Sequence, residues 1–120
     1  IRHLPHKLVE AFRATLEETT QATLLLHVID CHDSRRDENI EQVENVLAEI
    51  GADEIPMLQV FNKIDLLDGF EPRIDRNEEG LPVRAWVSAV TGEGLPLLFD
   101  AIVERLAEDV VHHFVRLLSS

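Results

Sequence analysis

The stretch VFNKID, residues 60–65, brings an amide, an ammonium and a carboxylate within four positions at the end of an apolar run. That run, residues 55–61, has the length and composition of a buried strand, and Pro56 stands near its start, where a missing backbone donor does least harm. Open α/β sheets bind ligands beyond the carboxyl ends of their parallel strands. The three polar side chains therefore occupy the place where such a sheet holds a ligand.

Strands and helices alternate along the rest of the chain. Continuous apolar runs of strand length cover residues 23–30 (TLLLHVID) and residues 84–89 (RAWVSA). Helical periodicity covers three segments, residues 5–22, 33–50 and 95–106. Because parallel strands need crossover connections, this alternation predicts an α/β fold, with a parallel sheet in three layers and helices on both faces.

The helix ends and two remaining segments give weaker signals. Asp33 and Ser34 offer an N-cap to the second helix, and Gly51 is typical of a residue that closes one. Residues 66–81 are polar and contain several turn formers, which predicts a short helix or an irregular loop. Residues 110–120 we interpret as the start of another strand.

Composition limits the function classes. The 120 residues carry 23 acidic and 11 basic side chains, a formal net charge of -12, so the segment repels nucleic-acid phosphates and is a poor general RNA or DNA surface. No apolar stretch approaches the roughly 20 residues that span a bilayer, which predicts no membrane span. Cys31 is the single cysteine, so no internal disulfide can form, and a reducing, cytoplasmic setting fits.

Metal sites find little support in the sequence. Asp30 and Asp33 follow a predicted strand, but a turn and a helix cap explain them without a metal ion. The six histidines show no convergent ligand spacing, and the adjacent His112 and His113 point apart on a helix. We therefore expect no metal ligand in this segment.

The polar groups at the two later strand ends fit a guanine base. The Asp65 carboxylate can accept two parallel hydrogen bonds, and guanine offers a matched pair of donors, N1–H and the exocyclic amino group, which adenine lacks. A backbone N–H of the Ser88–Ala89 turn can donate to guanine O6, and Lys63 can lay its apolar stem over the base. Asn62 can tie the two loops together or touch the base.

These residues carry a resemblance to a known family. Residues 62–65 (NKID) resemble the Asn-Lys-x-Asp guanine-specificity motif of P-loop GTPases, and Ser88-Ala89 resembles their Ser-Ala element. Residues 1–19 look like the switch II helix of the bacterial HflX family, and the similarity continues through residues 25–30 (LLHVID) and 70–76 (FEPRIDR). Nearly the whole chain thus resembles the C-terminal half of an HflX GTPase domain, from switch II onward.

The resemblance implies a cytoplasmic protein that binds GTP or GDP with Mg²⁺, hydrolyses GTP and associates with the ribosome, mainly through the large subunit. Its cofactor-binding residues in this segment would be Asn62, Lys63, Asp65, Ser88 and Ala89. No catalytic residue would lie here. Residues 1–109 would be the C-terminal part of the GTPase domain, and residues 110–120 the start of a C-terminal extension.

The phosphate-binding half of such a domain is not contained in these 120 residues. They have no Gly-x-x-x-x-Gly-Lys-Ser/Thr loop, and the Asp-x-x-Gly and magnesium ligands would lie upstream of Ile1. Because phosphoryl transfer depends on positioning and charge stabilisation by these groups, we expect the parent protein to hydrolyse GTP and this segment alone to be inactive.

Without the phosphate-binding half, the P-loop NTPase-like sheet would be incomplete. Without the phosphate-loop strand, the apolar strand of residues 24–29 would have a bare edge, and we expect the segment to self-associate along it. Arg2 and His3 could contact a γ-phosphate or a ribosomal partner, or be plain loop residues.

Two other interpretations remain open. A non-catalytic α/β interaction module could keep a GTPase-like half without nucleotide binding, and a nucleotide-binding measurement would separate the two. A response-regulator-like domain shares the alternation of strands and helices. It expects an acidic pair after its first strand, a lysine at a later strand end and no Ser-Ala turn, so we rank it last.

Overall fold

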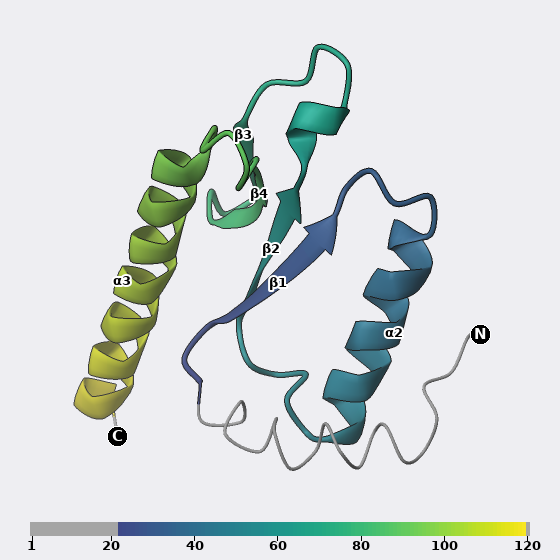
Figure 1. Cartoon of the computed structure of the whole chain (residues 1–120). Coiled ribbons are helices and arrows are strands. Elements are labelled where there is room, and N and C mark those ends of the chain that lie inside the picture. The colour runs from purple at the N-terminus through teal and green to yellow at the C-terminus, as the bar shows by residue number, and fades with distance from the viewer. Residues whose placement is uncertain (1–21, 120) are drawn as a thin grey trace.

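A four-stranded sheet lies between two helices in the computed structural model, which describes residues 22–119 (Figure 1). The elements in chain order are β1 (Leu25–Asp30), α2 (Arg36–Glu49), β2 (Met57–Asn62), the 3-10 helix η2 (Ile64–Leu66), β3 (Arg73–Arg76), β4 (Pro82–Trp86) and α3 (Leu95–Ser119). The helix predicted over residues 5–22, with Arg2 and His3 before it, lies outside the described residues except for its last position.

The strand order is β1-β2-β4-β3. The first three of these strands run parallel, with Asp30 opposite Asn62 and Phe61 opposite Trp86. β3 pairs with β4 in the antiparallel direction. The predicted α/β fold with a largely parallel, incomplete sheet is therefore confirmed, and the sheet has one strand more than the sequence indicated.

Alternate side chains of the strands pack against the two helices. Ile40 of α2 packs against one buried cluster, which consists of Ile29, Cys31, Phe61, Ile64 and Trp86. Leu95 and Leu98 of α3 pack against the other cluster, which consists of Val60, Ala85 and Val87. Strands covered on both faces need apolar side chains at successive positions, which explains the apolar runs of β2 and β4.

Two predictions for the weaker segments are wrong. Residues 73–76 (RIDR) form a strand instead of a loop, because their backbone pairs with β4 although three of the four side chains are charged. Residues 110–119 continue α3 instead of starting a strand. After Pro96, which stands in the first turn where proline is tolerated, no residue of that helix breaks it.

The ends of α2 give one correction and one confirmation. Asp33 and Ser34 do not cap the helix, since it begins at Arg36 and Arg35 makes no side-chain capping bond. The Asp33 carboxylate instead accepts the Arg35 backbone N–H at 2.9 Å, which forms a turn before the helix. Gly51 does close the helix: it has a φ of 76° and donates its N–H to the Ala48 carbonyl.

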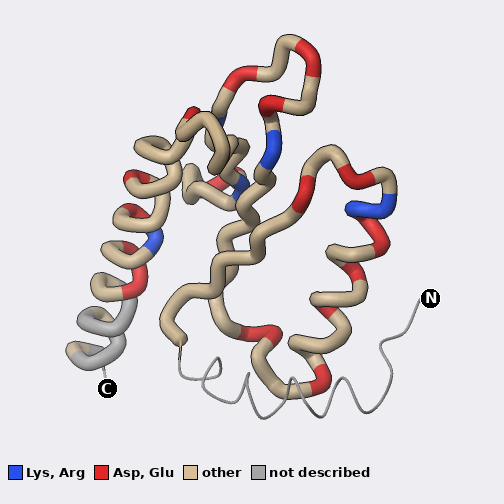
Figure 2. The backbone as a smooth tube through the Cα atoms, in the orientation of Figure 1, with Lys and Arg blue, Asp and Glu red and all other residues tan. Residues whose placement is uncertain are grey.

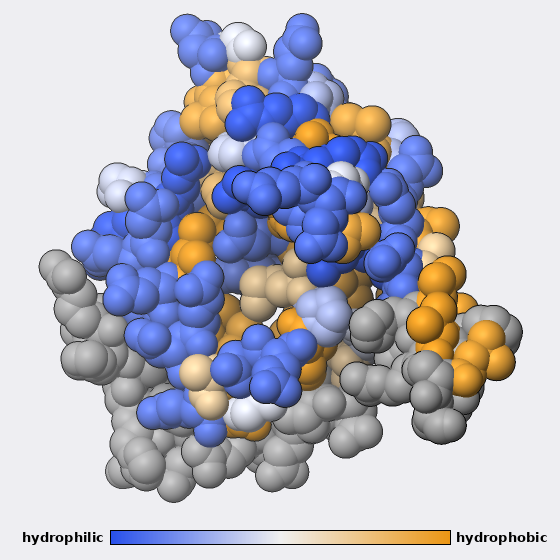
Figure 3. All heavy atoms as spheres, turned by 180° about the vertical axis from the view of Figure 1, so that it is seen from behind, coloured by the Kyte–Doolittle hydropathy of each residue, from blue (hydrophilic) through white to orange (hydrophobic). Residues whose placement is uncertain are grey.

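Surface properties differ between regions. Acidic residues run along α2 and through the loops around the sheet (Figure 2), in keeping with the net charge of -12. On β1, Leu26 and Val28 are 45% and 62% exposed. Exposed apolar side chains also follow α3, among them Phe99 and Val103. In the view from behind, apolar residues gather over the region of this helix (Figure 3). No helix within residues 22–119 is long and apolar enough to cross a membrane.

Candidate functional site

The carboxyl ends of β2 and β4 bring the two predicted loops together. The pairing of these strands continues beyond them, since Val87 N–H donates to the Phe61 carbonyl at 2.9 Å and Ile64 N–H donates to the Val87 carbonyl at 3.2 Å. Ile64 is 1% exposed and anchors the loop in the core. Residues 62–65 and 88–89 therefore lie side by side at one rim of the sheet.

Two hydrogen bonds join side chains of one loop to the other. The Asn62 Oδ1 atom accepts the Ala89 backbone N–H at 2.9 Å. The Ser88 hydroxyl donates to Asp65 Oδ1 at 2.8 Å and accepts the Thr91 N–H at 3.2 Å. Of the two roles considered for Asn62, the structure displays the tie between the loops. Four of the five predicted site residues thus form two hydrogen-bonded pairs, Asn62 with Ala89 and Asp65 with Ser88.

The Asp65 carboxylate is oriented and accessible. Ser88, which orients it, is fully buried, whereas Asp65 itself is exposed on η2. A hydroxyl with a fixed acceptor and a fixed donor cannot rotate freely, so it holds the carboxylate in one direction. An exposed carboxylate held in this way can accept a pair of N–H groups from a planar ligand.

Lys63 lies apart from this hydrogen-bonded set and points to β1. Its Nζ atom is 2.8 Å from Asp30 Oδ2, while Asp30 Oδ1 accepts the His32 N–H at 3.0 Å. The hydrogen bond from Lys63, and then that from His32, hold the pKa of Asp30 below its usual value of 3.8. The hydrogen bond to Asp30 raises the pKa of Lys63 above 10.5 in turn.

Asp30 is the residue that sequence reasoning missed. We interpreted it as part of a turn, and it does orient the His32 N–H, but it also binds the ammonium of Lys63 across two strands. The signal that could have revealed it is the strand order. If β1 and β2 are parallel neighbours, a residue at the end of one lies opposite a residue at the end of the other.

The turn after β4 is tight and depends on glycine. Ser88 N–H donates to the Glu93 carbonyl at 2.9 Å, and Gly92 N–H donates back to the Ser88 carbonyl at 2.8 Å. A Cβ atom at Gly94, which has a φ of 83°, would lie 2.8 Å from the Trp86 carbonyl oxygen. The turn predicted from the Thr-Gly-Glu-Gly sequence is present.

Aromatic and charged side chains surround Trp86, the residue two positions before the Ser88–Ala89 turn. Trp86, the last residue of β4, stacks on Phe61 with ring centroids 4.4 Å apart. Its indole N–H donates to Asp75 Oδ2 at 2.8 Å, and the Arg73 guanidinium lies over the ring at 4.8 Å from the centroid. β3 therefore holds the residue from which the Ser-Ala turn begins.

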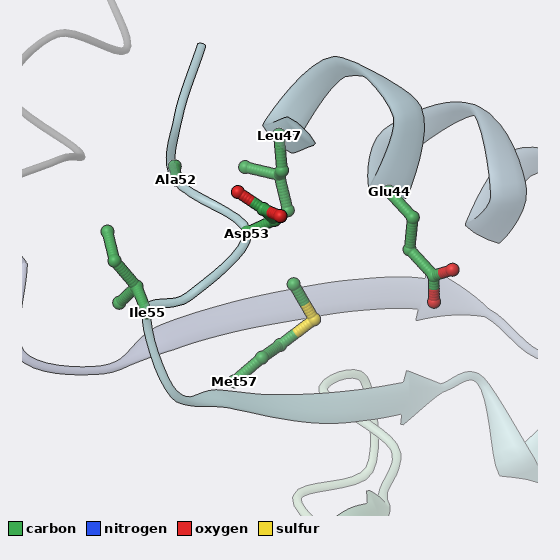
Figure 4. Close-up of a pocket in the computed structure, with 6 residues that line it drawn as sticks. All are labelled: Glu44, Leu47, Ala52, Asp53, Ile55 and Met57. Atoms are coloured by element: carbon green, nitrogen blue, oxygen red, sulfur yellow. The ribbon is translucent and has the colours of Figure 1, made fainter. Parts of the chain in front are cut away.

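A separate hollow of about 290 Å³ lies at the amino end of β2 (Figure 4). Its lining residues are Glu44, Leu47, Ala52, Asp53, Ile55 and Met57. No residue of the predicted site contributes to it. Within residues 22–119 no group of three His, Cys, Asp or Glu side chains is placed to hold a metal ion. Within the candidate site Asp65 accepts a hydrogen bond from Ser88, and Asp30, at the end of β1, accepts one from Lys63.

Comparisons with known proteins point in one direction. No family model matches the chain. It is 64% identical over 117 residues to a protein named GTPase HflX from Escherichia coli (strain K12), which covers 98% of this chain and 28% of that protein. It is 45% identical over 109 residues to GTPase HflX of Caldanaerobacter subterraneus, covering 91% of this chain and 24% of the relative. A third relative of the same name, from Magnetococcus marinus, is 44% identical over 104 residues. The chain thus spans about a quarter of the length of the curated relatives it matches.

Proposed function

Because this chain belongs to the HflX family of GTPases and spans one segment of its members, we propose that the carboxyl end of its sheet recognises the guanine base of GTP and GDP. Asp65 would accept guanine N1–H and the exocyclic amino group. The Ala89 N–H, which donates to Asn62 Oδ1 in the structure, would be shared with O6 of the bound base, and the Lys63 stem would cover one face of the base. Buried polar groups left unpaired by adenine would exclude ATP and ADP.

One observation carries this proposal. The two cross-loop hydrogen bonds, from Ser88 to Asp65 and from Ala89 to Asn62, are 2.8 and 2.9 Å long and hold both loops in one arrangement. A carboxylate that only capped a following helix would not need a hydroxyl from the next strand to direct it. Such preorganisation lowers the entropy cost of ordering the loops around a ligand.

The test is calorimetric titration of the whole parent protein with GDP and ADP. We expect GDP to bind and ADP not to bind. Asp65→Asn should weaken GDP binding on the order of 100-fold or more and favour xanthine nucleotides, because an amide matches the C2 carbonyl of xanthine. Asp68→Asn, an exposed aspartate three positions further on, is the matched control and should leave GDP binding unchanged.

A parent protein without preference for GDP over ADP would contradict the proposal. The NKID stretch would then be no more than a turn and helix start. The non-catalytic interaction module would become the better interpretation.

GTP hydrolysis we assign to the parent protein and not to this segment. The side chains at this rim would serve the base, and we expect the ligands of Mg²⁺ upstream of this segment. Magnesium would neutralise the phosphate charge during transfer. Phosphate release should therefore be measurable for the parent and absent for the 120-residue chain.

We further propose that the parent protein acts in the cytoplasm on the ribosome, through the large subunit. Membership of the family supports this proposal. The net charge of -12 argues that the phosphate-contacting surface lies elsewhere in the parent. Co-sedimentation of the parent with purified large subunits tests it, and failure to sediment with them in the presence of a non-hydrolysable GTP analogue would refute it.

The division of the chain into residues 1–109 and 110–120 also stays a proposal. α3 crosses residue 110 without a break. A C-terminal extension that starts there would therefore start inside a helix.

A further inference from the structure

The ammonium of Lys63 has a fixed place at the end of β1. Its Nζ atom lies 2.8 Å from Asp30 Oδ2, and the second oxygen of that carboxylate accepts the His32 N–H at 3.0 Å. Both oxygens of Asp30 are therefore in use. The backbone of its own turn orients the carboxylate, and the carboxylate in turn holds the lysine.

The backbone of Lys63 is constrained as well. Its φ of 74° and ψ of 33° are left-handed, and within residues 22–119 it is the one non-glycine residue with a positive φ. Left-handed backbone is unfavourable for an L-residue, so a residue held there is fixed by its surroundings. Here hydrogen bonds fix the two peptide groups on either side of Lys63. The Asn62 carbonyl accepts the Cys31 N–H, and the Ile64 N–H donates to the Val87 carbonyl.

A lysine stem fixed at both ends can no longer sample many rotamers. A free lysine side chain loses more conformational entropy than most when it is ordered, which weakens any contact it makes on binding. An ion pair already formed before the ligand arrives removes part of that cost. The stem then runs from the end of β2 toward the end of β1, along the carboxyl rim of the sheet on which the proposed base contacts lie.

We propose that Asp30 is a positioning residue of the guanine site, which aligns the Lys63 stem for contact with the base. This inference rests on the proposed function, since it concerns the same site. It adds a residue from a third strand end to a site otherwise built from β2 and β4. Asp30 itself touches no base atom and acts through Lys63.

The test compares two charge-matched variants of the whole parent protein. Asp30→Asn keeps an acceptor for the His32 N–H and removes the ion pair. Asp33→Asn likewise keeps the acceptor for the Arg35 N–H, and it removes a nearby negative charge that does not contact Lys63. We expect Asp30→Asn to weaken GDP binding roughly threefold, in the range of an exposed ion pair, and Asp33→Asn to leave it unchanged.

A double-mutant cycle separates positioning from a general structural effect. In the Lys63→Met background, Asp30→Asn should have no further effect on the GDP dissociation constant. An equal loss in that background would overturn the proposal, and so would unchanged or tighter GDP binding by Asp30→Asn alone. Tighter binding would mean that the ion pair competes with the nucleotide. If the wild-type parent shows no preference for GDP over ADP, the proposed function fails instead, so the two failures are distinguishable.

Discussion

The two edges of the sheet meet solvent in different ways. At the β3 edge the exposed side chains are charged and paired: Asp75 binds Arg73 and Arg84, and Arg76 binds Glu104 of α3. At the β1 edge Leu26 and Val28 are 45% and 62% exposed. Both strands leave one side of their backbone without a strand partner among residues 22–119.

This difference distinguishes an edge built to end a sheet from an edge suited to a further strand. Charged side chains on an edge strand discourage pairing with another chain, whereas flat apolar edges invite it. The charge pairs at β3 therefore close the sheet. The apolar residues of β1 leave that edge suited to a further strand, and the chain spans about a quarter of the length of the relatives it matches.

The largest effect on stability should come from the Trp86 indole, which contacts β3 at the edge of the sheet. Trp86→Ala would remove a side chain that is 8% exposed, stacks on Phe61 and donates to Asp75. We expect a loss of about 3–5 kcal/mol in the free energy of unfolding, measured by urea denaturation. Phe99→Ala, at a 65% exposed aromatic residue of α3, should change it by less than about 0.5 kcal/mol. A similar small loss for both variants would mean that β3 does not depend on the ring.

The next effect concerns the β1 edge and its predicted self-association. Val28→Lys should weaken association of the 120-residue chain about tenfold in sedimentation experiments, because it places a charge on the apolar edge. Val103→Lys makes the same change on the outer side of α3, where valine is 66% exposed instead of 62%, and should leave association unchanged. A monomeric profile for the wild-type chain would contradict self-association altogether.

A third prediction uses the pKa of Asp75. Burial alone would raise this pKa, but the hydrogen bond from Trp86 and the charges of Arg73 and Arg84 outweigh burial and hold it below 3.8. The carboxylate therefore stabilises the fold above the usual aspartate range, and that contribution disappears as the pH falls through the lowered folded-state pKa. Asp75→Asn should cost about 1 kcal/mol at pH 7 and progressively less as the pH falls below 3.8.

Urea denaturation of both proteins at pH 7 and at pH 3 measures this effect. Asp68→Asn, at an exposed aspartate outside the sheet, should show no such change with pH. If the cost of Asp75→Asn were the same at both pH values, the charge of Asp75 would not be what stabilises the β3 edge.

The sequence predicted the parallel strands well and the antiparallel one not at all. Strands β2 and β4 contribute to buried clusters on both faces, and β1 contributes Ile29 to one of them, so their apolar runs can be recognised in the sequence. β3 has only Ile74 to indicate a strand. Its stability comes from pairs with Arg84 and Trp86, which lie about ten positions further on and cannot be recognised before the pairing is known.

The candidate site shows the same division. Asn62, Asp65, Ser88 and Ala89 were found because they follow apolar runs and match a motif, and the structure brings them together. The contact between Lys63 and Asp30 joins residues 33 positions apart and depends on strand register. The left-handed backbone of Lys63 depends on hydrogen bonds from two neighbouring strands, so no local pattern predicts it.

The smallest effect should come from the outermost ion pair of the β3 edge. Glu104 binds Arg76 through both oxygens, at 2.7 and 3.2 Å, and Arg76 also donates to the Gly80 carbonyl. The two side chains are 43% and 47% exposed, so water and salt screen their attraction. Glu104→Gln should lower the free energy of unfolding slightly at low ionic strength and not at all in about 1 M salt, when compared with Glu108→Gln, an exposed neighbour on the same helix. A loss of stability that persisted in high salt would show that the geometry of these hydrogen bonds, and not the charge of the two side chains, stabilises the β3 edge. The β3 and β1 edges would then differ in their hydrogen bonding and not in the charge of their side chains.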